Sequence, residues 1–439
     1  MATHYGNMKA TFYRDFEATQ ELNPTEGSIA GPLYFSRSTA GTYVGSDGYI
    51  KTASANTPRF NYEYDSGGVL QYRGLYIDNG SSNNNFIYSE DFSQAVWTKT
   101  DAQIESTSTI SPNGIDNGSR LELTSSGGSL SYFINLIGTN SASLKRFLYI
   151  SVMAKAEECN HLRIRIANSN NYNVECYYNL SNGTVGTNTS GTAGQLLFVN
   201  KYVCNMGNGW YRLMFHIQDI QAASPGVDYT ISFTPTTSAS SITGNNGDGC
   251  LIFGAMLNTT FNQSNGYEIA FAQYIKTTGS VVNVAADVCN LTSKSLWLGQ
   301  YFGNEFTGFC QFYSPYNFCD VITGSALSFA FYTAANAYDG FFAIRHLRNN
   351  ANIVVDKYTP TYGRFDYANF ISRLGENRVA MAYNSTTWYT YVNGVNRGSR
   401  SAINYYEPRT MTLNGINNYK KVYILPISAN TTQLARITS

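Results

Sequence analysis

The pentapeptide LRIRI at residues 162–166 is the clearest structural signal in this chain. Leu162, Ile164 and Ile166 alternate with two arginines. Successive side chains of a β-strand point to opposite faces of its sheet. The alternation therefore predicts a strand with one face in a hydrophobic core and the other in water.

Similar strand-forming runs lie on both sides of this pentapeptide. They are rich in β-branched and aromatic residues, which strands favour. Clusters of Gly, Asn and Ser separate them, and the runs stand at residues 121–123, 147–152, 210–215 and 229–233. Short strands at this spacing favour two packed antiparallel sheets. We predict a jelly-roll-like sandwich over residues 86–280.

The C-terminal part carries a second set of strand signals. RVAMAY at 378–383 is followed by WYTYV at 388–392 and then by Asn393-Gly394. Asn-Gly favours the tight turn between antiparallel strands. This hairpin, a later run at 422–426 and a short closing helix at 431–438 resemble concanavalin and laminin-G sandwiches. The resemblance implies a second sandwich over residues 290–439.

The first 85 residues look less regular. Ser46-Asp47-Gly48 predicts a tight turn between strand formers, and Pro58 ends that ladder because proline has no N–H to donate. Elsewhere apolar residues are scattered, and the segment ends in an Asn-rich run typical of linkers. We predict an irregular N-terminal adaptor over residues 1–85. The predicted fold class is all-β, with this adaptor followed by two antiparallel sandwiches.

Composition excludes several functions. Of the 439 residues 13% are charged and the net charge is +0, so no polycation is present to neutralise nucleic-acid phosphates. No basic patch or amphipathic helix is suited to a membrane surface. No apolar run has the length of a signal peptide, which favours folding in a reducing cytosol. The seven cysteines form no CxxC pair and are expected to be free thiols.

Catalysis is poorly provided for in the sequence. Its four histidines lie far apart, none within a metal-binding pattern, and no Gly-x-Ser-x-Gly turn presents a serine nucleophile. His216 lies in an apolar run and is expected to be a strand residue. Three carboxylate pairs could in principle cleave glycans, namely Glu63/Asp65, Glu90/Asp91 and Glu157/Glu158. We predict no enzyme, no catalytic residue and no cofactor.

A calcium loop is the metal site that the sequence comes nearest to offering. Residues 245–249, NNGDG, present oxygen ligands on a tight loop, as calcium prefers. Only one carboxylate is present, however, and a calcium loop carries several. We therefore predict a plain turn and no metal site.

Aromatic residues are better candidates for ligand contact. Sugars present apolar C–H faces that pack on flat rings, and their hydroxyls need amide or carboxylate partners. Five rings lie near Asn-rich turns and are predicted to bind ligand: Trp97, Tyr172, Tyr178, Trp388 and Tyr389. Large rings more often fill cores, and Trp210 and Trp297, in apolar runs, are expected to do so.

The stretch FSRSTAGTYVGSDGYIKTASANTPRF at 35–60 resembles a module of tailed-phage virion proteins. Its marks are a Ser-Arg-Ser-Thr opening, an Asp-Gly hairpin and an Asn-x-Pro-Arg-Phe ending. The family's next motif is present as GLYID at 74–78. Its carbohydrate-binding-like jelly roll is matched by YSEDFS at 88–93, GWYR at 209–212 and IFGAML at 252–257, and a tail leads to AAD at 285–287.

The resemblance implies a virion structural protein at the particle exterior, made in the host cytoplasm. A tail-fibre or receptor-binding component that recognises host-surface glycan is the preferred interpretation. The N-terminal adaptor would attach it to other virion proteins, and a homotrimer is expected by analogy with phage fibres. No nucleic-acid or membrane partner is expected. The alternatives are a capsid decoration protein or head fibre, a virion-borne polysaccharide depolymerase, and a secreted cellular lectin.

Overall fold

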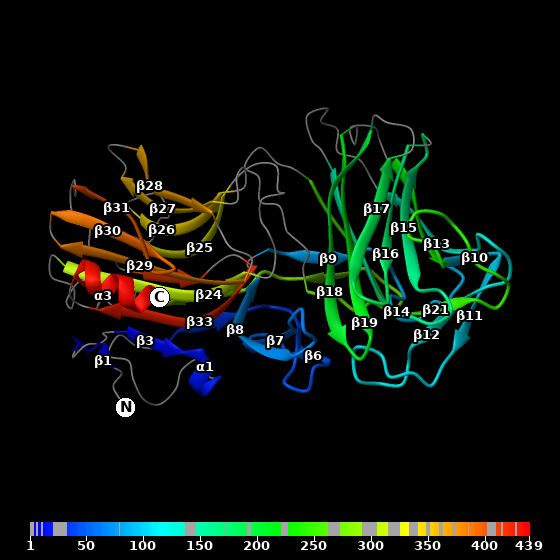
Figure 1. Ribbon diagram of the computed structural model, residues 1–439, viewed down its shortest axis with the longest axis horizontal. Coiled ribbons are helices and arrows are strands. Elements are labelled where there is room, and N and C mark those ends of the chain that lie inside the picture. The colour runs from blue at the N-terminus through cyan, green and yellow to red at the C-terminus, as the bar shows by residue number, and fades with distance from the viewer. Residues whose placement is uncertain are drawn as a thin grey trace.

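The computed structural model describes most of the chain. The described residues are 4–5, 8–9, 12–20, 33–78, 80–136, 146–170, 172–190, 195–220, 227–261, 273–291, 305–314, 325–332, 341–347, 352–359, 363–371, 375–384, 386–401, 410–413, 416–425 and 428–439. They form an almost entirely β structure, with two sandwiches at opposite ends of an elongated molecule (Figure 1). The predicted all-β fold with two antiparallel sandwiches is confirmed.

The first sandwich consists of two six-stranded antiparallel sheets. One sheet has the strand order β10 (Trp97–Thr100), β13 (Ser129–Leu136), β20 (Val227–Thr236), β15 (His161–Asn168), β16 (Asn173–Asn179) and β17 (Thr184–Ser190). The other has the order β11 (Ala102–Ser106), β12 (Ser119–Leu123), β21 (Gly249–Phe261), β14 (Arg146–Ala156), β19 (Trp210–Asp219) and β18 (Leu196–Gly207).

The LRIRI strand behaves as its alternation predicts. Leu162, Ile164 and Ile166 are fully buried in the core between the two sheets. On the opposite face Arg163 reaches the neighbouring strand β16, where its Nη1 lies 3.2 Å from Glu175 Oε2. The apolar face therefore holds the sandwich together, and the polar face is closed by an ion pair across two strands.

The second sandwich has one seven-stranded and one eight-stranded sheet. The first runs in the order β28 (Gly363–Ile371), β27 (Asn352–Thr359), β26 (Phe341–Leu347), β25 (Ser325–Tyr332), β32 (Thr410–Leu413), β23 (Val288–Leu291) and β4 (Tyr34–Ser36). The second runs in the order β31 (Val395–Ser401), β30 (Thr387–Val392), β29 (Gly375–Asn384), β24 (Glu305–Ser314), β33 (Ile416–Leu425), β8 (Leu70–Asp78) and β7 (Arg59–Tyr64), and β3 (Phe12–Asp15) also pairs with β33.

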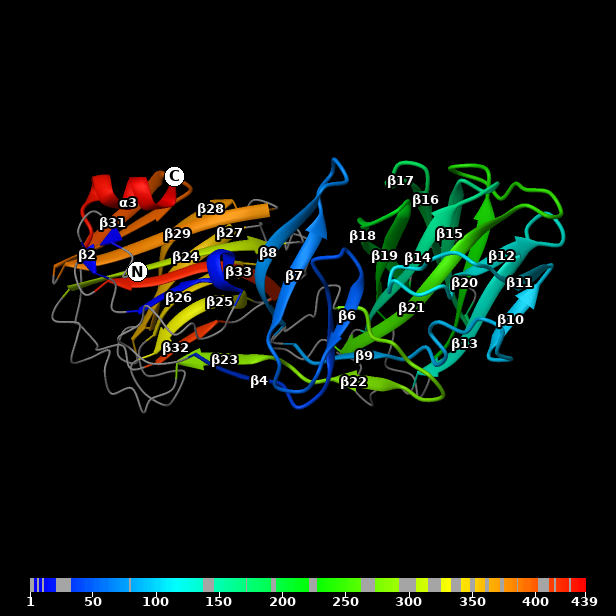
Figure 2. The same cartoon turned by 90° about the horizontal axis from the view of Figure 1, so that it is seen from below.

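The N-terminal segment differs from the irregular adaptor that we expected. Strand β4 pairs with β23, and β8 pairs with β33, so this segment completes both sheets of the second sandwich. Strand β9 (Ser82–Asn84) then pairs with β22 (Val282–Val284). The first sandwich is thus inserted into the second between β9 and β22, and β7 and β8 lie between the two (Figure 2). The partners of β4 and β8 in these sheets, β23 and β33, are so distant in sequence that no local hairpin pattern predicts the pairing.

Short local elements follow the sequence more closely. Strands β5 (Gly41–Val44) and β6 (Ile50–Ala53) form the hairpin predicted around Gly48. Asn393 and Gly394 both have positive φ and form the predicted two-residue turn between β30 and β31. The remaining elements are β1 (His4–Tyr5), β2 (Met8–Lys9), the four-residue helix α1 (Phe16–Thr19) and the predicted closing helix α3 (Thr431–Thr438).

Helix α3 begins at a capping box. The Asn430 side chain accepts a hydrogen bond from Gln433 N, and the Gln433 side chain accepts one from Asn430 N. Leu434 is buried and packs the helix against β29 and β30. Within the part of the chain that the structure describes, no helix is long and apolar enough to cross a membrane.

Candidate functional site

Three of the five aromatic residues predicted to bind ligand are buried in cores. Trp97 has no exposed surface, and its indole N–H donates to Tyr88 O at 3.1 Å. Tyr178 is equally buried, and its hydroxyl donates to Met214 O at 2.7 Å. Trp388 is 6% exposed and belongs to the core of the second sandwich. These three rings cannot stack on a sugar in this conformation, so the prediction is wrong for them.

The other two predicted rings are only half-buried. Tyr172 packs at the margin of the first core, and Tyr389 packs beside the core cluster that contains Leu434. Neither residue lines the cavity described below. Nearness to an Asn-rich turn therefore did not identify exposed rings, because a strand can bury its ring one residue away from a polar turn.

His216 and Trp210, which we expected to be structural, are both buried. His216 is buried and stacked on Tyr149, with ring centroids 4.0 Å apart, and burial lowers its pKa to about 3. It is therefore neutral at physiological pH and has no charge to use as an acid. Trp210 is buried with its N–H bonded to Ile110 O. Trp297 lies outside the described residues.

The carboxylate pairs noted in the sequence have structural partners. Glu157 and Glu158 both bind Arg120, each at 2.8 Å. Glu90 accepts from the Tyr274 hydroxyl at 3.0 Å and pairs with Lys276 at 2.6 Å. In the NNGDG loop the Asp248 carboxylate accepts from Asn245 N, as in the plain turn that we predicted. Among the residues that the structure describes, no group of three His, Cys, Asp or Glu side chains could hold a metal ion.

A cavity of about 520 Å³ lies where the two sandwiches meet. We call it the junction cavity. One wall comes from the N-terminal strands β5–β8 and from β24, and the opposite wall comes from β14, β18, β19 and the turn after β16. Most of its polar and aromatic lining consists of Tyr43, Asn61, Glu63, Tyr64, Asp65, Tyr76, Asn205, Tyr211, Arg212, Gln273, Tyr274 and Tyr313.

Arg212 is the cation of the cavity wall on the first sandwich. Its side chain sits on β19 and is 8% exposed as a residue. Its Nε and Nη2 donate to Ser151 Oγ at 3.3 and 3.2 Å, and Nη2 also lies 3.6 Å from Met256 Sδ. No carboxylate pairs with it among the described residues. A buried guanidinium thus meets only neutral groups at this wall.

Glu63 lies on the N-terminal wall. Its side chain is 27% exposed, and its Oε2 lies 3.6 Å from Arg73 Nε. Burial raises the pKa of this carboxyl to about 7, although Arg73 and a hydrogen bond with Tyr313 act in the opposite direction. Glu63 therefore changes its charge near neutral pH.

Close packing of glycines against Tyr64 holds the two walls together. A Cβ atom at Gly48 or at Gly207 would overlap the Tyr64 phenol. Both glycines also have φ near +80°, a conformation that side chains rarely adopt. Tyr64 is therefore wedged between the β5–β6 turn and the β18–β19 turn, one from each side of the cavity.

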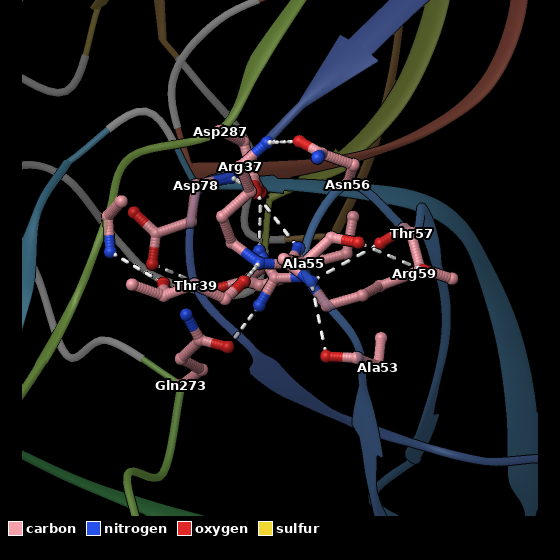
Figure 3. A network of polar contacts seen from close by, with 12 residues as sticks. Arg37, Thr39, Ala53, Ala55, Asn56, Thr57, Arg59, Asp78, Gln273 and Asp287 are labelled. Atoms are coloured by element: carbon pink, nitrogen blue, oxygen red, sulfur yellow. Dashed lines mark hydrogen bonds and ion pairs between the residues drawn. The ribbon is translucent and has the colours of Figure 1, made fainter.

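A buried ionic network, which we call the junction cluster, adjoins the cavity through Gln273 and is drawn in Figure 3. It consists of Arg37, Arg59, Asp78, Gln273 and Asp287. Arg37 Nη1 lies 3.1 Å from Asp287 Oδ1, and Arg59 pairs with the other Asp287 oxygen. That oxygen also accepts from Asp78 N at 2.8 Å. Both ion pairs have no exposed side-chain surface, so they are shielded from water and salt.

The junction cluster fixes part of the cavity wall. Gln273 Oε1 accepts from Arg59 and, at 2.7 Å, from Thr42 N. The Arg59 guanidinium also lies 4.5 Å from the centre of the Tyr76 ring. Gln273, Thr42 and Tyr76 all line the cavity. Arg37, Arg59, Asp78 and Asp287 are thus joined in one structural network. They come from the Ser-Arg-Ser-Thr, Asn-x-Pro-Arg-Phe, GLYID and AAD motifs of the sequence.

Comparison with known proteins yields distant structural similarities alone. No family profile and no curated protein matches the chain. Similar solved structures include a Ruminococcus gnavus IT-sialidase CBM40 bound to α2,3-sialyllactose, with TM-score 0.27 and 9% identity over 32% of this chain and 85% of that one. Domain 4 of a Geobacillus stearothermophilus GH43 arabinanase, in complex with arabinotriose, has a TM-score of 0.28 and 12% identity over 39% of this chain and 82% of that one. Mouse laminin α1 domains LG4–5 have a TM-score of 0.21 and 10% identity over 70% of this chain and 89% of that one. These scores are too low to carry an argument, so the functional argument rests on the cavity.

Proposed function

We propose that this protein binds carbohydrate in the junction cavity and does not cleave it. The observation that carries the proposal is the combination of size and lining in this one cavity. Its volume of about 520 Å³ falls within the range of about 300–1,000 Å³ that is typical of small-molecule sites. Six tyrosines line it together with amides, a carboxylate and a guanidinium.

This lining suits the two sides of a sugar. Tyrosine rings pack against the apolar C–H face of a pyranose. Amide groups supply hydrogen bonds to its hydroxyls, and two cavity amides are held in place by their oxygens. Asn61 Oδ1 accepts from Val44 N and Asn205 Oδ1 accepts from Gly207 N, both at 2.9 Å. Each is thereby oriented before a ligand arrives, which lowers the entropic cost of binding.

The absence of turnover is the second part of the proposal. Glycoside hydrolysis ordinarily needs two carboxyl groups with separate roles on either side of the bond. Glu63 and Asp65 both line the cavity but belong to the same end of one strand. Asp65 Oδ1 accepts from Gly67 N and from Val69 N, both at 2.9 Å. These bonds hold the Asp65 carboxylate in the turn of its own hairpin. Among the described residues that line the cavity, no second carboxyl lies on the wall opposite Glu63.

A polysaccharide depolymerase is the alternative, and one observation favours it. The pKa of Glu63 is raised to about 7, whereas hydrogen bonds from the backbone and from Gln71 lower that of Asp65. Carboxyls with pKa values pushed apart can act as acid and base. Incubation of host polysaccharide with the protein distinguishes the two: shortened chains in size-exclusion chromatography would establish the depolymerase.

The biological setting that we propose is the exterior of a tailed-phage virion, where the protein would be a tail-fibre or receptor-binding component. This rests on the sequence resemblance, and a decoration protein or head fibre remains the alternative location. A homotrimer suits either, because several linked weak sites raise avidity by ~10²–10⁴. Localisation of the protein on purified particles by immunogold labelling tests the setting.

Binding in the cavity is tested with a matched pair of tyrosine variants. Tyr43 lines the junction cavity, whereas Tyr34 is 51% exposed and lies outside it. In titration calorimetry with host oligosaccharide, Tyr43→Ala should weaken binding by about 3- to 10-fold, the range expected for one ring contact. Tyr34→Ala should bind like the wild type. Equal affinities of all three proteins would contradict the proposed site.

A further inference from the structure

We infer that the saccharide carries a carboxylate and that this carboxylate pairs with Arg212. The inference rests on the proposed carbohydrate-binding function and specifies the chemical class of its ligand. It begins from the buried guanidinium on the first sandwich. A buried charge is costly unless an opposite charge compensates it.

The two buried arginines of the junction cluster have their charges compensated by a carboxylate. Arg37 and Arg59 are both 1% exposed or less, and both pair with the Asp287 carboxylate. Arg212 is 8% exposed and lines the cavity, yet its described partners are a serine hydroxyl and a methionine sulfur. Among described residues the Arg212 charge has no anion beside it, and the cavity gives a ligand access to it.

The two strands that pair with β19 place no acidic residue opposite Arg212. On the sheet face its cross-strand neighbours are Met153 of β14 and Cys204 of β18. Burial raises the pKa of the Cys204 thiol to about 12, which keeps it neutral. The Glu90 carboxylate also acts on the Tyr274 hydroxyl near Arg212, but it pairs with Lys276. An acidic ligand group would therefore meet a cation that no described carboxylate pairs with, and a charge-assisted hydrogen bond to it is strong.

The opposite wall is compatible with such a ligand below neutral pH. Glu63 is protonated below its pKa of about 7 and then does not repel an anion. Asp65 keeps its charge but is turned to its own hairpin by two backbone N–H groups. Arg73 pairs with Glu63, and its guanidinium lies 4.0 Å from the centre of the Tyr313 ring. The cavity is thus least negative when Glu63 is neutral.

A carboxylate fits this arrangement better than a phosphate or a sulfate ester. The planar guanidinium matches the two oxygens of a carboxylate. A single cation also balances a single negative charge, whereas a phosphate monoester carries nearly two at neutral pH. Uronic and nonulosonic acids are the sugars that carry a carboxylate, so they form the expected ligand class.

The test compares each acidic sugar with its own methyl ester, which removes the charge and keeps the ring. The probes are trigalacturonic acid, a hyaluronan tetrasaccharide and 3′-sialyllactose, titrated at pH 6 by calorimetry. At least one acid should bind about tenfold more tightly than its ester, because a charge-assisted pair contributes at least that factor. Arg212→Gln should abolish this difference between acid and ester, and Arg212→Lys should restore part of it.

Arg165→Gln is the matched control, because Arg165 lies on the other sheet, 32% exposed and outside the cavity. It should retain the preference for the acid. Equal binding of every acid and its ester would overturn this inference and leave carbohydrate binding intact. If acetate bound as tightly as the acids, the site would be a simple anion site, and the inference would also fail. If neither acids nor esters bound, the proposed function would fail with it.

Discussion

Asp287 is the residue whose replacement tests the junction cluster most severely. In Asp287→Asn the side chain keeps its shape but loses the negative charge that lies between Arg37 and Arg59. Two guanidinium groups without exposed side-chain surface then face each other without their shared counter-ion. Removing one partner from a buried ion pair costs about 3–5 kcal/mol. We expect a loss of that size in the free energy of unfolding.

Equilibrium urea unfolding, followed by tryptophan fluorescence and circular dichroism, measures this loss. The two sandwiches can unfold in separate transitions, so the midpoint of each is compared with the wild type. The transition of the second sandwich should shift more, because the cluster joins β4, β7 and β8 of its sheets to the residue just before β23. A shift confined to the first sandwich would contradict this assignment.

Asp47→Asn is the matched control for Asp287→Asn. Asp47 also pairs with a cation, Lys51 at 2.5 Å, but both side chains are more than 40% exposed. Exposed pairs contribute about 0–1 kcal/mol, so this variant should unfold nearly like the wild type. If Asp287→Asn lost less than about 1 kcal/mol, or no more than Asp47→Asn, the cluster would not hold the junction and the reasoning would be refuted.

Three further predictions concern Asp78, Gly207 and the cysteines. Burial raises the pKa of the Asp78 carboxyl from 3.8 to about 7, so the folded state holds this proton more tightly than the unfolded state does. The protonated group therefore loses its stabilising effect as pH rises from 4 to 7. In urea titrations Asp78→Asn should gain stability relative to the wild type across this range, and a constant difference would contradict the raised pKa. Gly207→Ala should destabilise the protein more than Gly247→Ala, since both have positive φ but an added Cβ meets nothing at Gly247; equal melting temperatures would refute the Tyr64 wedge. Cys159, Cys176, Cys204, Cys250 and Cys310 are free thiols, and Cys319 lies outside the described residues. We expect denaturing mass spectrometry without reductant to find seven thiols, and a mass deficit of two hydrogens would reveal a disulfide.

Local signals in the sequence predicted much of the fold. The alternation at 162–166, the Asn393-Gly394 turn and the closing helix each depend on interactions between near neighbours, and each is present. The strands at 70–78 and 34–36 were missed for the opposite reason. Their partners, β33 and β23, lie hundreds of residues away in sequence, and long-range pairing leaves no local pattern to read.

The candidate site was harder to predict than the fold. Stacking residues were sought beside polar turns, yet Trp97, Tyr178 and Trp388 fill cores. The junction cavity collects residues from strands β5 to β24, and only the insertion of one sandwich into the other brings them together. One signal was present: Arg212 interrupts the apolar run WYRLMF at 210–215. A charge within such a run indicates either a buried partner or a ligand.

The central claim is that the junction cavity holds carbohydrate, and a crystal structure with bound host oligosaccharide tests it most directly. Uncleaved sugar should appear between β7 and β19, in contact with cavity tyrosines and with its acidic group at Arg212. Sugar bound elsewhere on either sandwich, with the junction cavity empty, would contradict the account.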